Sequence, residues 1–495
     1  MKKFYLVMLL IVSIIVSSVF FSCVKETNGE SKETDSNDSS ASDTVNEGEA
    51  KTDVPQDIPA IDMSGKTFRI LTAGWYDYPP LSVTDIVKEE MTGESLDDAV
   101  RDRQLYLEEK YNIKIEQIDF VHFWESDDSL LKTIQADEAA YDLALMRSCS
   151  FNSLATGGNI YDLSEIPTID LERPWWDSNS YDSLSLLGKH YGICSDITMN
   201  DDLSVWCVFF NKNMIQDYAL DNPYNLVKNN QWTYDKIFEM GKLISKDVNS
   251  DGIRNKDDMF GINHINDAVL GMMNCVGVNI GELDNSGNLE FTLNRENNIT
   301  KMLNILTNLF DQDNVYNLHA RGEGVADGAM FSQGQILFDF SAIQVAPGLR
   351  MMEQDFGILP YPKYDETQSD YMSSVSPLYL TVSVVPVTNT DLENTGIIME
   401  EMAYQGYKNI RPAFYDILLE GKIARDDESL DMLDYIFKNV VYDVGAMWNI
   451  GAFSWEFVSI SQEYNLNVAS FIEARKEQVQ SDINKITEEL TKANG

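Results

Sequence analysis

The chain has 495 residues, of which 44% are hydrophobic and 11% aromatic. A chain of this length is too long to fold around one hydrophobic core, so we predict two or more lobes. Its formal net charge of −43 argues against nucleic acid and anionic lipid as partners, because phosphates are bound by Lys and Arg. Such acidity suits a solvated protein outside the cell, although it identifies no ligand.

The first residues have the pattern of a secretory signal peptide. Lys2 and Lys3 form a basic region, residues 4–16 are apolar, and small residues follow. The stretch from Phe20 to Cys23 resembles a lipoprotein cleavage site, so we predict a signal peptide over residues 1–22 and lipidation of Cys23. Phe20 and Ser22 depart from the usual pattern, and ordinary cleavage beside an incidental Cys is the alternative. Several acyl chains would anchor the protein durably to a membrane, outside the cytoplasm.

Residues 23–62 are rich in Ser, Thr, Asp and Glu and almost free of large apolar side chains. Such a composition cannot bury enough apolar surface to fold. We therefore predict a disordered acidic tether, with the folded part beginning near Met63.

The first folded stretch alternates strand and helix patterns. Residues 66–72 predict a strand, and a helix follows from Ser95, an N-cap candidate with Asp98 at the capping-box position. A second strand starts at residues 113–115, and the apolar run 141–146 predicts a buried third strand. This order predicts α/β structure with parallel strand pairing.

The alternation continues through the rest of the chain. We predict strands at 205–211, 336–338 and 379–385, a helix at 233–245 capped by Thr233, and a final amphipathic helix that buries Val479, Ile483, Ile486 and Leu490. The prediction is two α/β lobes: residues 63–200 with 381–430, and residues 201–380 with 431–495.

Four cysteines remain after Cys23, namely Cys149, Cys194, Cys207 and Cys275. A disulfide is possible in an exported protein, and separate buried thiols are an equally good reading. Zinc is disfavoured because the chain has only four His and none stands at ligand spacing with a Cys.

Residues 247–258, DVNSDGIRNKDD, have nearly the spacing of an EF-hand calcium loop. The predicted metal ligands are Asp247, Asn249, Asp251, the Ile253 carbonyl, Asn255 and Asp258. The hydrophobic residue stands one position early, and Asp258 replaces the longer Glu of an EF-hand. We predict a structural Ca²⁺ between a helix and the strand 259–262, and an Asx-rich turn without metal is the alternative.

Several segments, taken in order, resemble the extracellular solute-binding proteins of ABC importers, of the large carbohydrate-type group (family 1). The resemblance lies in residues 107–115, 140–143, 174–177, 188–192, 208–213, 232–235, 331–337 and 355–362. It implies a two-lobed, type II periplasmic-binding-protein-like fold, with the ligand in a cleft between lobes that close about a hinge. It places the chain crossings near residues 195–206, 375–385 and 426–443.

Sugar rings stack on aromatic side chains while polar neighbours bind their hydroxyls. The aromatic ligand candidates are Trp75 and Tyr76 after the first strand, and Trp448 and Trp455 beyond the last crossing. The polar candidates, at strand ends and near a crossing, are Arg147, Ser148, Asp196, Asp339 and Ser341. Core packing of each Trp, a buried ion pair for Arg147 and a helix cap for Asp196 are the alternatives.

The resemblance implies a lipid-anchored, monomeric receptor that captures a carbohydrate, with an oligosaccharide preferred, and delivers it to the transmembrane subunits of an ABC permease. A ligand-sensing or host- or matrix-binding surface lipoprotein of the same fold is an alternative. An importer receptor for a non-sugar ligand, such as a peptide or polyamine, is another. No enzyme is predicted, because no nucleophile elbow, phosphate loop, HExxH or Cys/His pair stands out.

Overall fold

The computed structural model describes residues 57–74, 83–419 and 426–492. These residues belong to one compact unit, Asp57–Gly495. The predicted signal peptide, Cys23 and the tether before residue 57 lie outside the described residues, as do Trp75 and Tyr76.

The first lobe is built on a four-stranded sheet with the order β12-β3-β1-β2. Its strands are β1 (Lys66–Thr72), β2 (Ile113–Asp119), β3 (Leu143–Arg147) and β12 (Thr381–Val384). The strand β1 pairs in parallel with β2 and β3, whereas β12 runs antiparallel to β3, with Thr381 opposite Arg147. A strand from late in the chain therefore completes a sheet whose other strands come from the beginning.

The second lobe is built on a five-stranded sheet with the order β10-β4-β9-β5-β8. Its strands are β4 (Trp206–Asn211), β5 (Phe260–His264), β8 (Val315–Asn317), β9 (Ile336–Ala342) and β10 (Phe356–Leu359). The strands β5, β8 and β9 are parallel, and β4 is antiparallel to β9 and β10. All residues of β4, β5, β9 and β10 are buried, which explains their nearly continuous apolar sequences.

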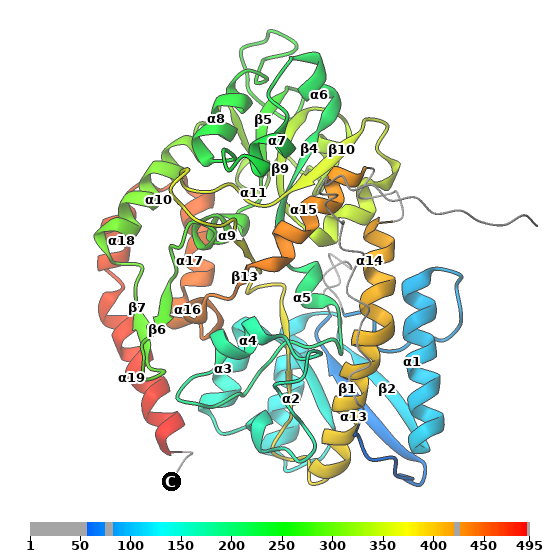
Figure 1. Ribbon diagram of the computed structural model, residues 1–495. Coiled ribbons are helices and arrows are strands. Elements are labelled where there is room, and N and C mark those ends of the chain that lie inside the picture. The colour runs from blue at the N-terminus through cyan, green and yellow to red at the C-terminus, as the bar shows by residue number, and fades with distance from the viewer. Residues whose placement is uncertain (1–56, 75–82, 420–425, 493–495) are drawn as a thin grey trace, which may run out of the picture. The chain divides into compact units, whose positions relative to one another are not determined.

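Helices surround both sheets (Figure 1). Those before the second lobe are α1 (Ser95–Tyr111), α2 (Phe123–Gln135), α3 (Ser148–Thr156), α4 (Ser178–Leu184) and α5 (Asn200–Leu203). Those within it are α6 (Lys212–Asp217), α7 (Pro223–Lys228), α8 (Tyr234–Lys242), α9 (Ala268–Asn274), α10 (Glu296–Leu309), α11 (Leu318–Arg321) and α12 (Ala329–Ser332). Those that follow β12 are α13 (Leu392–Gln405), α14 (Arg411–Leu419), α15 (Asp427–Lys438), α16 (Val444–Met447), α17 (Phe453–Gln462), α18 (Val468–Glu473) and α19 (Lys476–Lys492).

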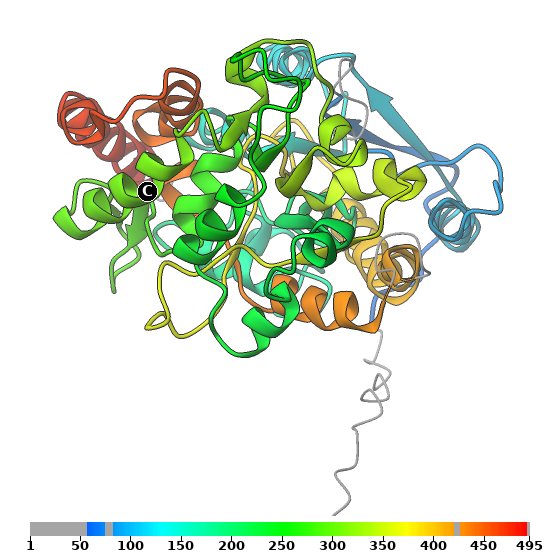
Figure 2. The ribbon, with the colours of Figure 1, turned by 90° about the horizontal axis from the view of Figure 1, so that it is seen from above.

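A π-helical turn, Gly406–Ile410, joins α13 to α14, and both helices pack against α1 in the first lobe. Figure 2 shows α1 and this long helix side by side and nearly end-on. The next helix, α15, packs instead against β10 and α7 of the second lobe. The chain therefore changes lobe between α14 and α15.

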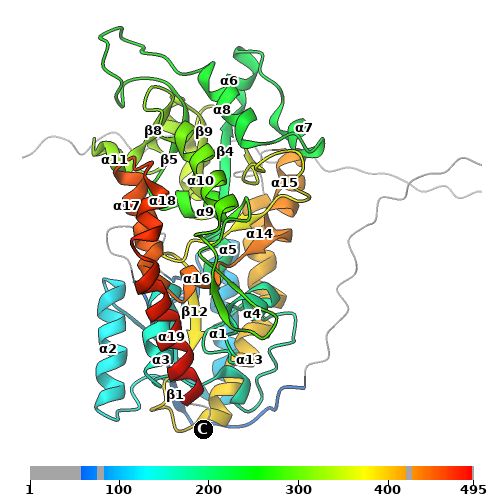
Figure 3. The same ribbon diagram turned by 90° about the vertical axis from the view of Figure 1, so that its left-hand side faces the viewer.

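The lobes are joined where α5 leads into β4 and where residues 375–380 return to β12. The short strands β11 (Ser373–Ser374) and β13 (Val440–Val441) pair with each other in this middle region. Figure 1 places α5, β13 and α16 between the two sheets. The strands β6 (Gly281–Leu283) and β7 (Leu289–Phe291) form a hairpin. The C-terminal helix α19 packs on this hairpin and on α3 of the first lobe. Figure 3 shows α19 running beside α3.

Most predicted elements occur close to their predicted bounds. The strand β1 spans residues 66–72, Thr233 caps α8 by accepting the Lys236 N–H, and α19 buries Val479, Ile483, Ile486 and Leu490. The predicted N-cap at Ser95 is wrong, because Glu94 occupies that position. The Asp98 carboxylate instead accepts the N–H groups of Thr92 and Gly93 and holds the preceding turn.

Candidate functional site

One hydrogen bond joins a residue at the carboxyl ends of the first-lobe strands to a residue at the carboxyl ends of the second-lobe strands. Tyr379 precedes β12, and because β12 is antiparallel to β3, Tyr379 lies at the carboxyl end of β3. Asp267 follows the carboxyl end of β5 in the second lobe. The Tyr379 hydroxyl donates to Asp267 Oδ2 over 2.8 Å. Ligands of open α/β sheets bind at such strand ends, so this meeting point defines the candidate site.

Arg147 and Ser148 form the first-lobe side of this site. Both are buried, and both donate to the chain just before Tyr379: Arg147 to the Leu378 carbonyl, and Ser148 Oγ to the Pro377 carbonyl over 2.8 Å. Burial lowers the pKa of Arg147 to about 10. These two predicted residues are brought together, and they fix the second crossing to the end of β3.

An aromatic group extends this side of the site beyond β2. The Arg147 guanidinium lies 5.0 Å from the ring centre of Phe123. The His122 and Trp124 rings stack in parallel, with centres 4.2 Å apart. Trp124 is 51% exposed, which is unusual for an indole and leaves a ring available to a ligand.

A polar pair follows the ends of the second-lobe strands. His319, just beyond β8, lies 3.7 Å from Asp327. Burial lowers the pKa of His319, but Asp327 and Asp267 outweigh it, so the net shift is upward. Burial raises the pKa of Asp267, and the Tyr379 hydrogen bond opposes this. This side therefore carries two imidazoles, those of His319 and of the buried His264 at the end of β5, together with the carboxylates.

Asp339 and Ser341 lie on β9, in the same sheet. Asp339 is 1% exposed and accepts a hydrogen bond from the Asn263 amide on the neighbouring strand. Burial raises its pKa to about 7, and Asp327 adds to the rise. Its Oδ2 has no hydrogen-bond partner among the described residues. Ser341, also buried, pairs in register with Cys207 of β4.

The other sequence candidates lie elsewhere in the described structure. Trp448 has no exposed surface: its ring meets Phe151 edge to face and its Nε1 donates to the Leu184 carbonyl, so packing is its observed role. Trp455 is 44% exposed on α17. Asp196 is buried in the first crossing, 2.9 Å from the Arg411 guanidinium, so it takes part in an ion pair and not in a helix cap.

Sequence reasoning missed Trp124, Asp267 and His319. The strand-end rule, which predicts ligand residues after the first and third strands, also applies after the second strand, which is followed by Phe120-Val121-His122-Phe123-Trp124. The same rule applied after the strand at 259–262 would have pointed to Asp267. The signal was present in both cases.

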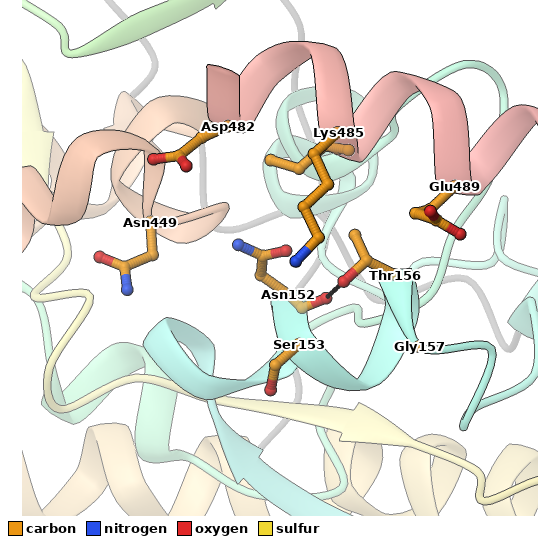
Figure 4. Close-up of a pocket in the computed structure, with 9 residues that line it drawn as sticks. Asn152, Ser153, Thr156, Gly157, Asn449, Asp482, Lys485 and Glu489 are labelled. Atoms are coloured by element: carbon orange, nitrogen blue, oxygen red, sulfur yellow. Dashed lines mark hydrogen bonds between the residues drawn. The ribbon is translucent and has the colours of Figure 1, made fainter. Parts of the chain in front are cut away.

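A separate polar pocket of about 410 Å³ lies between α3, Asn449 and α19 (Figure 4). Its walls carry hydroxyls, amides, the carboxylates of Asp482 and Glu489 and the ammonium of Lys485. Asn152 closes one side by donating to the Trp448 carbonyl. Without an aromatic face, this pocket suits a small polar molecule or water more than a sugar ring.

In the EF-like loop, the side-chain oxygens accept backbone N–H groups of the loop itself. Asp247 accepts from Ser250 and Gly252, and Asp251 accepts from Ile253. Asp258 is buried, accepts from Val248 and Asn255, and lies 3.7 Å from the Arg254 guanidinium. Among the described residues, no three His, Cys, Asp or Glu side chains are grouped to hold a metal.

The four described cysteines are unpaired, and Cys194, Cys207 and Cys275 are buried. Burial raises the pKa of the Cys207 thiol well above its ordinary value. Separate buried thiols, one of the two readings of the sequence, therefore describe this arrangement.

No protein-family model matches the sequence, and no curated protein matches it. Solved structures do resemble this fold. An ABC substrate-binding protein from Listeria monocytogenes in complex with cycloalternan is 14% identical, with a TM-score of 0.54, and the match covers 87% of this chain and 99% of that one. A maltose/maltodextrin-binding domain from Bdellovibrio bacteriovorus bound to maltotriose is 14% identical, with a TM-score of 0.53, covering 85% and 100%.

A third such structure has a different ligand. UgpB from Mycobacterium tuberculosis, in complex with glycerophosphocholine, is 13% identical, with a TM-score of 0.54, covering 85% of this chain and 98% of that one. Together these likenesses confirm the predicted two-lobed, type II fold of solute-binding proteins.

Proposed function

We propose that this chain is the substrate-binding component of an ABC importer and that it captures a carbohydrate between its lobes. The meeting of the two strand edges at Tyr379 and Asp267 is the observation that carries the proposal. A ligand touching both edges would favour a closed arrangement of the lobes by its contacts with each. The structural neighbours in complex with cycloalternan and maltotriose support a sugar.

Trp124 is the side chain we assign to the sugar ring. Its exposed indole, held parallel to His122, offers an apolar face at the end of β2. Hydroxyl-binding groups stand at the other strand ends, including the carboxylate of Asp267 and the imidazole of His319.

The envelope setting completes the proposal. Cys23 would carry the lipid anchor, the acidic tether would hold the folded monomer away from the membrane, and the permease subunits would receive the sugar. Among the described residues, no helix is both long and apolar enough to cross a membrane. One structural neighbour is an ABC substrate-binding protein and another is a maltose/maltodextrin-binding domain, which supports binding and not catalysis as the activity.

The test is mass spectrometry of ligand co-purified with the full chain, followed by thermal shift with neutral mono- and oligosaccharides. A sugar at a hundredfold excess over its Kd should stabilise the protein by about 2.7 kcal/mol. The Trp124→Ala variant should bind that sugar about tenfold more weakly, whereas Tyr218→Ala, at an exposed ring of the second lobe, should bind normally. Absence of a shift with every sugar would refute the carbohydrate assignment.

A cationic ligand is the second candidate, because carboxylates gather at the same site. Asp267, Asp327 and Asp339 outnumber His319 on the second-lobe side, and the neighbour bound to glycerophosphocholine shows that this fold takes a ligand with a cationic group. Adding spermidine and choline esters to the panel separates the two candidates. Stabilisation by these alone would move the assignment from sugar to cation. A sensing role would be favoured if no permease genes neighbour the gene.

Calcium remains a proposal for the EF-like loop. Asp247, Asn249, Asp251, the Ile253 carbonyl and Asn255 would hold the ion, but Asp258 is engaged by two backbone N–H groups and lies near Arg254. The present arrangement therefore fits an incomplete shell, and we expect weak binding that affects the second lobe alone.

A further inference from the structure

Four carboxylates lie where the lobes join, of which Asp196 and Asp201 are buried and Asp177 and Asp202 are half-buried. Asp177 caps α4, Asp196 lies at the start of the first crossing, and Asp201 and Asp202 belong to α5 within it. Figure 1 shows α5 between the two sheets, beside α14. All four lie in the first crossing or beside it, since the Asp177 N–H donates to the Cys194 carbonyl and Asp201 and Asp202 belong to α5.

One described ion pair serves this cluster. Arg411, at the start of α14, lies 2.9 Å from Asp196 Oδ1. The guanidinium of the nearby Arg103 donates to backbone carbonyls, over 2.8 Å to that of Ile197 and over 2.5 Å to that of Asp85. The side-chain oxygen Oδ2 of Asp202 has no hydrogen-bond partner among the described residues. Among the described residues, the ion pair of the cluster is therefore the one between Asp196 and Arg411, and Asp201 and Asp202 have none.

The packing around the cluster leaves little space for relaxation. Gly406, in the π-helical turn, lies so close to the crossing that a Cβ there would come within 1.7 Å of the Asp196 carbonyl oxygen. The second crossing is tied in as well, since Asn200 Oδ1 accepts the Thr381 N–H over 2.7 Å. The cluster therefore touches the segments that any hinge motion must bend.

Charge balance requires protons in such a cluster. An unpaired buried carboxylate costs several kcal/mol, so it takes up a proton instead. Burial raises the pKa of Asp196 to about 8 although Arg411 opposes the rise, and burial raises the pKa of Asp201, Asp202 and Asp177 as well. The other titratable or charged groups that face the cluster are Arg103, Arg411, Tyr415, Tyr442, Cys194 and Asp85.

We propose that the hinge is a pH-dependent latch: the crossings pack as observed while protons neutralise the carboxylates of Asp201 and Asp202, and they loosen as the pH rises. Each of these acids has a folded pKa above its unfolded value. The folded state therefore binds more protons than the unfolded state. The free energy of unfolding falls as the pH rises from the pKa of these acids in the unfolded chain through their pKa in the folded protein.

The test compares the melting temperature of the full chain between about pH 6 and about pH 8.5. The wild type should lose roughly 3 °C for each proton that the cluster releases. Asp201→Asn, which copies the protonated form and breaks no ion pair in the described structure, should flatten the slope. Asp202→Asn is the second variant, and Asp102→Asn on the exposed face of α1 is the matched control. Slopes equal to that of the control in both variants would overturn the proposal.

The hinge itself is followed with two labels, at Lys132→Cys on α2 and Glu239→Cys on α8, in a Cys149→Ser background. The distance between the labels should change or broaden as the pH rises in the wild type and change less in Asp201→Asn. A constant distance with a normal stability slope would make the cluster a stability element only, and would overturn its role as a latch. Neither readout requires a ligand, so failure of the sugar assignment leaves this test intact.

Discussion

Two regions of the molecule gather carboxylates, and they differ in how each charge is met. At the strand edges, Asp267 accepts from the Tyr379 hydroxyl and Asp327 lies beside His319. At the first crossing, Asp196 pairs with the Arg411 guanidinium, whereas Asp201 and Asp202 on α5 have no ion pair among the described residues. The edge uses hydrogen-bonding groups that a ligand could replace or extend, whereas the crossing depends on an ion pair and on protons. Similar residue types are therefore met by a hydroxyl and an imidazole in one place and by a guanidinium in the other.

The largest effect should come from removing the guanidinium of the crossing. Arg411→Met leaves Asp196 buried without its partner, a change that costs about 3–5 kcal/mol when the remaining charge cannot be neutralised. A proton can replace Arg411 at low pH, so the loss in unfolding free energy should be smaller near pH 6 and should grow with pH. Urea unfolding at several pH values measures it.

The control for this prediction is Lys132→Met, which removes an exposed lysine from α2 and should change the unfolding free energy by less than about 0.5 kcal/mol. A loss in Arg411→Met that does not depend on pH would show that protons do not compensate for the guanidinium. The two regions would then differ in the arrangement of their charged groups and not in their dependence on protons.

Removing the hydrogen bond at the strand edges should lower the free energy of unfolding less than Arg411→Met does. Tyr379→Phe removes the hydroxyl that joins the lobes, and the expected loss is about 1 kcal/mol of unfolding free energy. The pKa of Asp267 should rise further, because the hydrogen bond that favours its charged form is gone. Urea unfolding measures the loss, and its dependence on pH reports the shift.

Tyr361→Phe is the matched control for the edge variant. The Tyr361 hydroxyl is buried and has no hydrogen-bond partner among the described residues, so its removal should be neutral or stabilising. An equal loss in both variants would mean that Tyr379 acts through packing, for example against Trp206, and not through its bond to Asp267.

The smallest effect should come from calcium, at a loop apart from both regions. Calcium at ten times its Kd should stabilise the second lobe by about 1.4 kcal/mol, and chelation should reverse this. Thermal shift with Ca²⁺, with Mg²⁺ and with chelator measures the change, and Asp251→Asn should weaken it. Ligand affinity should stay constant while the protein remains folded; a large loss on chelation would place the loop in the binding machinery.

The sequence alone predicted the two-lobed α/β fold, since strand and helix periodicities are local and follow from burial of one face. It also predicted that Arg147 and Ser148 stand at the end of β3, because strand ends follow from strand bounds. The exposed Trp124 also follows a strand end, that of β2, but it is not among the residues that the sequence predicted. It placed Asp196 near the first crossing, but as a ligand contact or a helix cap.

Only the tertiary structure decided the partners. Arg411 is 215 residues from Asp196, and Tyr379 is 112 residues from Asp267. Such pairs depend on how β12 and α14 return to the first lobe, which no local pattern encodes. Burial depends on the same packing. The sequence does not distinguish Trp448 from Trp124, yet Trp448 is buried against Phe151 whereas Trp124 is exposed beside His122. Local periodicity determines the elements, whereas long-range packing determines which charges and rings remain available for function.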